Sequence, residues 1–292
     1  MSRRINEYES RGDRWEELKD DDERPRERRR RPIREKDARV TTLFEGDGFA
    51  VVFKPSGVLT IPGRRPEPHP TVLEQIHDLW LESDPVAAPP VVCHRLDRDT
   101  SGCLVVARDR PTAREIMTRF RHRQVEKSYL ALVTGAPYPT EGQVDFRVAP
   151  DRKRPGTMWT PRKGGKPCHD DYETVEIFRG VSLVRVFPRT GRTHEVRLAL
   201  KTLGTPCAID PLYGTPEPIL LSTWKRGYRV GRGREERPLI DRLTLHAESI
   251  QFPPPGADAE DRDAWIRVEA PLPKDLATTL TQLRKHAAPG SL

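Results

Sequence analysis

The 292-residue sequence has few of the features that mark a metalloprotein, a secreted protein or a membrane protein. Its four cysteines, at positions 93, 103, 168 and 207, form no Cys-x-x-Cys pair, so neither a zinc site nor a disulfide scaffold is expected. No apolar run approaches the roughly 20 residues that cross a bilayer, and none follows the N-terminal arginines as in a signal peptide. Phosphate-binding loops and dinucleotide fingerprints are also missing. We therefore expect a cytoplasmic protein without a metal, a small-molecule cofactor or a membrane anchor.

Positive charge is what the sequence has in excess. Lys and Arg number 51 against 44 Asp and Glu, which gives a formal net charge of +7 and a pI near 9.4. A positive field attracts phosphate over long distances, so the composition indicates a polyanionic partner. Nucleic acid is the first candidate and an anionic membrane surface is the second. The length and the 35% hydrophobic content favour one main folded domain.

The first 38 residues differ from the rest of the chain. They hold 13 Lys or Arg and 12 Asp or Glu with almost no apolar periodicity, a composition that buries too little surface to offset the entropy of ordering. We predict a disordered charged tail over 1–38 and one folded domain over 39–292. The arginine-rich RPRERRRRPIR of the tail could contact RNA or could be a solvated polyampholyte, and the sequence leaves both open.

Short strand-like runs alternate with turns from residue 38 onward, and four helical patterns interrupt them. Thr71 is a good N-cap for the first helix, in which Val72, Ile76, Leu79 and Trp80 recur at helical spacing. The predicted helices cover 71–83, 110–123, 192–204 and 274–286. The predicted strands are a hairpin within 40–57 and the runs 102–108, 125–135, 171–178, 182–188, 243–252 and 264–271. Strands that outnumber helices without strict alternation predict an α+β fold with a mixed, largely antiparallel sheet and flanking helices.

A single carboxylate lies among basic residues in HRLDRDTSG, residues 94–102. Asp97 follows Arg95 and precedes Arg98, and nearby cations keep a carboxyl group ionised near neutral pH. An ionised, fixed carboxylate can act as a nucleophile or a base. A structural salt bridge explains the same pattern, and this stretch alone does not decide between the two.

Two later stretches place polar groups together. Lys127 and Tyr129 lie two positions apart in VEKSYLAL and so share one face of a strand. In TGRTHEVRLAL, His194 and Arg197 fall on one face of the predicted helix, together with Leu198 and Lys201. Each stretch by itself is weak evidence for a site, whereas the combination with Asp97 is specific.

The sequence resembles the RluA-type pseudouridine synthases. The resemblance spans about residues 40–255 and is carried by six stretches. They are KPSGVLTIPG (54–63), HRLDRDTSGCLVVAR (94–108), EKSYLALVTG (126–135), TGRTHEVRLAL (190–200), PLYG (211–214) and RLTLHAESIQF (242–252). The resemblance implies the pseudouridine synthase fold, an RNA substrate and an isomerisation that detaches uracil from ribose and rejoins it through C5, with no cofactor.

Residue roles follow from the matched positions. Asp97 is implied as the catalytic aspartate, Tyr129 as the ring that stacks on the target uracil, and Arg197 as the cation paired with Asp97. Arg95 is implied to enter the RNA stack where the flipped base had been. We assign Lys127 to the neighbourhood of the pocket or a phosphate. Arg192 and His194, in the matched TGRTH motif, are further candidate RNA contacts.

Basic segments outside these motifs supply candidate RNA-binding surface. Segment 151–166 contains Lys153 and Arg154 beside Met158 and Trp159, and segment 225–237 begins with Lys225 and Arg226. Cations with interleaved rings are typical of single-stranded RNA binding. Solvated charged loops are the alternative for both segments. We expect a monomer that acts on ribosomal or transfer RNA.

Two positions depart from the usual family pattern. Glu195 stands where Gln is usual, and Ala199 where a second His is frequent. Glu195 could compete for Arg197, although residues two apart on a helix do not normally face each other. No S4-type RNA-binding domain is evident. The sequence leaves two alternatives open: an RNA-binding protein that keeps the fold but has lost catalysis, and a DNA-binding or structural protein.

Overall fold

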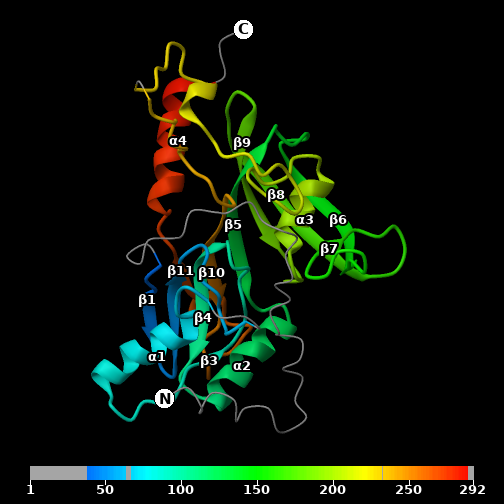
Figure 1. Ribbon diagram of the computed structural model, residues 1–292. Coiled ribbons are helices and arrows are strands. Elements are labelled where there is room, and N and C mark those ends of the chain that lie inside the picture. Colours follow the sequence, from blue (N-terminus) through cyan, green and yellow to red (C-terminus); the bar gives the residue numbers. More distant parts are fainter. Residues whose placement is uncertain (1–37, 64–66, 232, 289–292) are drawn as a thin grey trace.

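The computed structural model of the protein describes residues 38–63, 67–231 and 233–288, and Figure 1 shows their arrangement. Apart from Ala38, the predicted charged tail lies outside the described residues. Ala38 is buried and belongs to the same apolar cluster as Val40. None of the helices in these ranges is long and apolar enough to span a bilayer.

One eleven-stranded sheet forms the centre of the molecule. Its strands are β1 (Thr41–Gly46), β2 (Phe49–Lys54), β3 (Val91–Val92), β4 (Ser101–Ala107), β5 (Glu126–Thr134), β6 (Glu141–Pro150), β7 (Met158–Trp159), β8 (Lys166–Ile177), β9 (Val181–Pro188), β10 (Leu245–Phe252) and β11 (Ile266–Glu269). They run in the order β1-β2-β4-β10-β5-β9-β8-β6-β7, with β3 on β4 and β11 on β10. Only β4 and β10 pair in parallel among these strands, which confirms the predicted mixed, largely antiparallel α+β fold.

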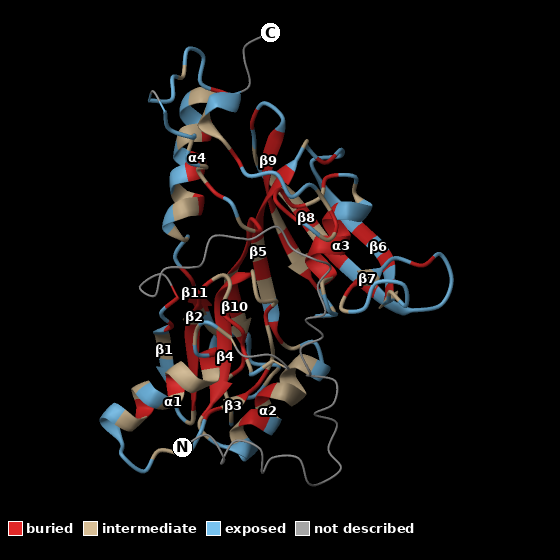
Figure 2. Cartoon of the chain, viewed as in Figure 1, coloured by how far each residue is buried: buried red, intermediate tan, exposed pale blue. Residues whose placement is uncertain are grey.

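Helices cover both faces of the sheet. In the half built on β2 and β4, α1 (Val72–Ser83) packs on Val52 and Leu104. The alternate side chains, such as Val51 and Val105, face α2 (Arg110–Arg121). Successive strand residues point to opposite faces, so a strand covered on both sides is apolar throughout. This accounts for the continuous GCLVV run, and Figure 2 shows the buried strands between half-exposed helices.

The other half follows the same plan. There α3 (Glu195–Thr202) packs on one face of β5 and β9, against Ala131 and Val184. On the opposite face, α4 (Lys274–His286) packs against Leu132 and Leu183. The two halves meet where β10 lies between β4 and β5, near the middle of Figure 1.

Glycine is required where β4 meets β10. Gly102 has φ +121°, a value that L side chains rarely adopt, and it pairs with Ala247. A Cβ atom at Gly102 would lie 2.1 Å from the Ala247 carbonyl oxygen. The close approach of the two backbones therefore excludes any side chain, as expected for a glycine kept for its backbone.

Sequence periodicity located most elements and missed or misplaced a few. The predicted N-cap of α1 is confirmed, because Thr71 and Glu74 form a capping box. Strand β6 was not predicted, although Val144, Phe146 and Val148 alternate along it and are buried. The predicted helix 192–204 begins only at Glu195, because the preceding His194 adopts a left-handed backbone with φ 55°.

Candidate active site

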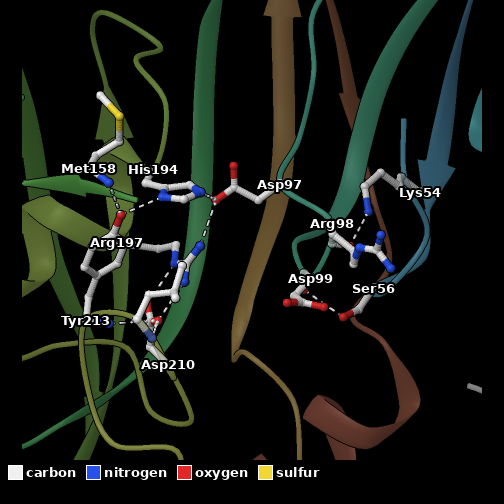
Figure 3. Close-up of polar contacts among 11 residues, drawn as sticks. Lys54, Ser56, Asp97, Arg98, Asp99, Met158, His194, Arg197, Asp210 and Tyr213 are labelled. Atoms are coloured by element: carbon white, nitrogen blue, oxygen red, sulfur yellow. Dashed lines mark hydrogen bonds and ion pairs between the residues drawn. The ribbon is translucent and has the colours of Figure 1, made fainter. Parts of the chain in front are cut away.

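Asp97 lies in the loop between β3 and β4, and the turn after β2 holds this loop in place. The ammonium group of Lys54 is fully buried and donates to the Arg98 carbonyl oxygen at 2.7 Å. The Ser56 hydroxyl donates to the Asp99 carbonyl oxygen, also at 2.7 Å. Figure 3 shows these contacts on one side of Asp97. The KPSG stretch thus binds the backbone immediately after Asp97.

Arg197 faces Asp97 from the other side, across the junction of the two halves (Figure 3). Its Nη1 donates to Asp97 Oδ2 at 3.3 Å. Its Nε and Nη2 donate to the two carboxylate oxygens of Asp210 at 2.8 and 2.7 Å. Arg197 and Asp210 are both buried. The bidentate pair with Asp210 fixes the plane of the guanidinium group, which leaves Nη1 directed at Asp97.

The segment that carries Asp210 is shaped by an unusual backbone. Ile209 has φ 59°, a left-handed conformation that costs a β-branched residue roughly 1–2 kcal/mol. Asp210 Oδ1 then accepts hydrogen bonds from the backbone N–H groups of Leu212 (2.9 Å) and Tyr213 (3.2 Å). These bonds close the turn of the PLYG stretch around the Asp210 carboxylate.

His194 is the third group beside Asp97. Its Nε2 lies 3.8 Å from Asp97 Oδ2, and its Nδ1 lies 2.6 Å from the Tyr213 hydroxyl oxygen. The Met158 N–H donates to the same hydroxyl oxygen at 2.9 Å. Tyr213 can therefore donate its proton to Nδ1, which leaves the N–H of His194 at Nε2, facing Asp97.

These neighbours keep Asp97 ionised. Burial favours its neutral form, but His194, when it is protonated in acid, and the charges of Arg197 and Arg95 outweigh burial and hold the pKa of Asp97 below its ordinary value. Burial also lowers the pKa of His194, to about 4, despite the opposing effect of Asp97. His194 is therefore neutral near pH 7, and Arg197 with Arg95 supplies the permanent positive charge.

A pocket of about 460 Å³ opens beside Asp97. The structure brings together in its wall seven of the residues predicted to form the site. They are Arg95, Asp97, Lys127, Tyr129, Arg192, His194 and Arg197. Tyr129 is half-buried, and burial, followed by the charge of Asp97, raises the pKa of its hydroxyl. The phenol is therefore neutral at physiological pH.

The other predicted contacts lie elsewhere. Lys153 and Arg154 are exposed between β6 and β7, outside the pocket wall. Lys225 and Arg226 are exposed near the C-terminal end of α4, where Lys225 acts on the pKa of His286. These four residues are candidates for RNA contacts away from the pocket, and not for contacts with the reacting uridine.

Arg98 is not the neighbour of Asp97 that the sequence suggested. Its guanidinium pairs with Glu67. The backbone of Arg98, by contrast, accepts the hydrogen bond from Lys54. Arg98 therefore acts on the loop through its carbonyl group.

The two departures from the family pattern also have defined surroundings. Glu195 does not compete for Arg197: it accepts hydrogen bonds from the Thr190 hydroxyl and from the Arg192 N–H. Ala199 is fully buried in the core cluster beneath α3 and is not among the residues that line the pocket.

Sequence reasoning missed Asp210 and Tyr213 as parts of the site. Asp210 immediately precedes the PLYG stretch, which the resemblance already included, and it is an acid within an otherwise apolar run, PCAIDPLYG. An acid in such a run is expected to be buried and paired, which was the available signal.

Comparisons with known proteins identify the family of the chain. A family model described as RNA pseudouridylate synthase matches residues 48–202. The dual-specificity RNA pseudouridine synthase RluA of Escherichia coli K12 is 34% identical over 217 residues, which cover 74% of this chain and 88% of the relative. Ribosomal large subunit pseudouridine synthase D of Nitrosomonas europaea is 32% identical over 248 residues, covering 83% of this chain and 64% of that protein.

Solved structures share the fold. Human RNA pseudouridylate synthase domain containing 4 superposes with a TM-score of 0.62 at 24% identity, covering 83% of this chain and 92% of that chain. Human RNA pseudouridylate synthase domain containing 1 superposes with a TM-score of 0.57, also at 24% identity, and the match covers 89% of this chain and 100% of that chain. From the family match and the RluA relative, the chain belongs to the RluA-type family of RNA pseudouridine synthases.

Proposed function

We propose that this enzyme converts specific uridines of structured RNA, ribosomal or transfer, to pseudouridine, with Asp97 as the catalytic carboxylate. The reaction breaks the bond between uracil N1 and ribose C1′ and forms a bond between C5 and C1′. The proton leaves C5, and N1 gains one, so the atoms balance without an external reactant. The enzyme's own residues supply the carboxylate and the pocket in which the detached base turns.

One observation carries the proposal: an ionised carboxylate lies in the wall of a pocket and faces a buried arginine. Asp97 retains 20% side-chain exposure, whereas the side chain of Arg197 retains 6%. The carboxylate is therefore accessible to a substrate while its cation is not. This arrangement suits a group that reacts with the sugar or base, and a purely structural ion pair would not need the exposed side.

The remaining pocket residues support a flipped uridine as the substrate. A volume of about 460 Å³ accommodates one nucleoside, whereas a base pair in a duplex is inaccessible to a pocket of this kind. The ring of Tyr129 offers a stacking surface, and we assign Arg95, at the pocket wall, to the gap that the flipped base leaves in the RNA stack.

The class of RNA is supported by composition and by the names of relatives. The net charge of +7 favours binding to a phosphate backbone. One relative is named for the large ribosomal subunit, and another is named for dual specificity. Both names are compatible with ribosomal RNA as one substrate.

Mapping the modification on RNA tests the proposal. Total RNA from cells that lack the enzyme is incubated with the purified protein, and pseudouridine is mapped at nucleotide resolution. We expect new pseudouridine at a small number of sites in ribosomal RNA, transfer RNA or both. RNA that is bound without any new pseudouridine would mean that the fold is kept without catalysis.

A further inference from the structure

Asp170 is a buried acid that the proposed reaction does not use. It lies on β8, and 1% of its surface is exposed. Neither of its carboxylate oxygens accepts a hydrogen bond from any of the described residues. An ionised carboxylate without a partner in this position would cost free energy of folding. The Asp170 carboxyl group is therefore expected to carry a proton or to share one with a nearby acid.

The group beside it is a second buried acid, Glu195. Asp170 pairs across the sheet with Pro188 at the end of β9, two residues before Thr190, whose hydroxyl donates to Glu195, and the carboxyl groups of Asp170 and Glu195 lie within hydrogen-bonding reach. Glu195 is 3% exposed and lies at the start of α3, in the wall of the pocket. One Glu195 oxygen accepts from the Thr190 hydroxyl, and the other accepts from the Arg192 N–H at 2.5 Å. Glu195 therefore holds the turn that leads into α3, and hydrogen bonds of this kind favour its ionised form.

Lys127 completes the cluster. Its ammonium group lies against the same turn, because a Cβ atom added to Gly191 would be 3.2 Å from Lys127 Nζ. Burial lowers the pKa of Lys127, and the charges of Glu195 and Asp170 oppose that effect. One cation therefore faces two carboxyl groups.

We propose that Asp170 and Glu195 share one proton, so that the pair carries a single negative charge that compensates Lys127 and fixes the Thr190–Arg192 turn against the pocket. Both are positioning residues for the reaction, and this part of the inference rests on the proposed function. Two adjacent buried carboxylates cannot both ionise at moderate cost. A shared proton also gives Asp170 a partner, because the protonated carboxyl donates to Glu195.

Electrostatics agree with this geometry. Burial, followed by the charge of Glu195 and a hydrogen bond to it, raises the pKa of Asp170 to about 9. Arg189 and Arg192 approach the pair through their backbone N–H groups. The titratable side chains that face it are Lys127 and Tyr129 on β5 and Cys168 on β8. Burial raises the pKa of Cys168 to about 12 and raises that of Tyr129. Of these groups, only Lys127 has a lowered pKa, so Asp170 and Lys127 are the two candidates for titration in mildly alkaline solution.

The proton can be detected without measuring activity. Infrared spectra of the full-length protein near pH 7 should contain the carbonyl stretch of a protonated carboxylic acid. Asp170→Asn should remove this band, because Glu195 then stays ionised, while Glu141→Gln, which changes an exposed acid on β6, should leave it. Absence of the band in the wild-type protein, or its persistence in Asp170→Asn, would overturn the proposal.

Thermal unfolding gives a second, independent readout. The folded pKa of Asp170, about 9, lies above its value in the unfolded chain, so the folded state binds an extra proton between the two values. The stability contributed by this proton is full at low pH and is lost as the pH rises toward 9. Relative to Asp170→Asn, the wild-type melting temperature should therefore fall by more than about 3 °C between pH 6 and pH 9. A constant difference would contradict the shared proton.

Activity then tests the positioning role. Asp170→Asn and Glu195→Gln each leave one carboxylate to compensate Lys127, so each should lower the saturating rate less than about tenfold. The double substitution leaves none, and it should lower the rate at least about tenfold more than the product of the two single effects. If the two effects simply multiply, the carboxyls do not share one charge. An inactive wild-type protein would instead refute the proposed function and leave the infrared and melting results unaffected.

Discussion

At the scale of single residues, the site depends on two different contacts of the Arg197 guanidinium group. Two of its nitrogens bind Asp210 in a buried bidentate pair, and a third reaches Asp97 at 3.3 Å. The stronger contact serves orientation, and the weaker contact leaves Asp97 accessible. Folding stability should therefore depend mainly on the Asp210–Arg197 pair, and catalysis on the Arg197–Asp97 contact.

Double-mutant cycles should show that Arg197 is coupled more strongly to Asp210 than to Asp97 in folding stability. Arg197→Met leaves the buried Asp210 without its partner, and removal of one member of such a pair costs about 3–5 kcal/mol of unfolding free energy. The loss should be much smaller when Asp210→Asn is already present, and only slightly smaller with Asp97→Asn. Chemical denaturation of the single and double variants measures both coupling energies. A larger coupling to Asp97 than to Asp210 would contradict the geometry.

Tyr129 can be tested through its ring. Phe keeps the stacking surface and removes the hydroxyl, whereas Leu removes both, and stacking of a base on an aromatic ring contributes about 1–3 kcal/mol. Tyr129→Leu should therefore lower the saturating rate about tenfold or more below that of Tyr129→Phe. Single-turnover rates on a short RNA stem-loop make the comparison. Equal rates for Tyr, Phe and Leu would eliminate stacking as its role.

At the scale of elements, the position of Asp97 depends on backbone contacts between segments far apart in the sequence. The turn after β2 binds the backbone of the Asp97 loop, and the parallel contact of β4 with β10 sets where that loop ends. Gly102 lies at that contact, so a side chain there would separate β4 from β10 and displace the loop.

Two glycine substitutions distinguish the steric clash with the Ala247 backbone from the strain of a positive φ angle. Gly102 and Gly180 both have positive φ, but a Cβ atom at Gly180 meets nothing within 4 Å. Gly180→Ala should cost only the conformational strain, about 1–2 kcal/mol. Gly102→Ala should cost several kcal/mol more and lower activity, because the Ala247 backbone must move. Similar unfolding free energies for the two variants would show that the strand contact tolerates a side chain.

Local patterns predicted the elements well and the non-local parts of the site less well. Helix α1 and its capping box follow from spacing within a dozen residues, and the Asp97–Arg197 pair follows from motifs matched to a family. Asp210 could not be placed in this way, because its position depends on the left-handed backbone of Ile209, which no local preference predicts. The predicted start of helix α3 was too early for the same reason, because the backbone of His194 also has a left-handed conformation.

At the scale of the whole molecule, positive charge is distributed well beyond the pocket. Arg226 is exposed, follows Lys225, which acts on His286 at the end of α4, and does not line the pocket. Figure 1 shows α4 and α2, the helix that borders the pocket, at opposite ends of the molecule. An arginine in that position can bind RNA phosphate without affecting the reacting atoms. Affinity and chemistry should therefore be separable in this protein.

Arg226→Ala should weaken RNA binding and reduce the slope of log K against log salt by about 1, while the saturating rate is unchanged. Titrations at several salt concentrations give the slope, and single-turnover assays give the rate. Arg197→Met should show the reverse pattern, a lower rate with affinity largely kept. An unchanged salt slope for Arg226→Ala would remove this surface from the RNA-binding region.

The most direct test of the account is the single-turnover rate of Asp97→Asn on an RNA that the wild-type enzyme modifies. The amide keeps the shape of the side chain but cannot act as a nucleophile or base. We predict no detectable pseudouridine, RNA affinity within a few fold of wild type, and normal activity for Asp145→Asn, which changes an exposed acid on β6. Pseudouridine formation by Asp97→Asn at more than about 1% of the wild-type rate would contradict the assignment of Asp97 as the catalytic residue.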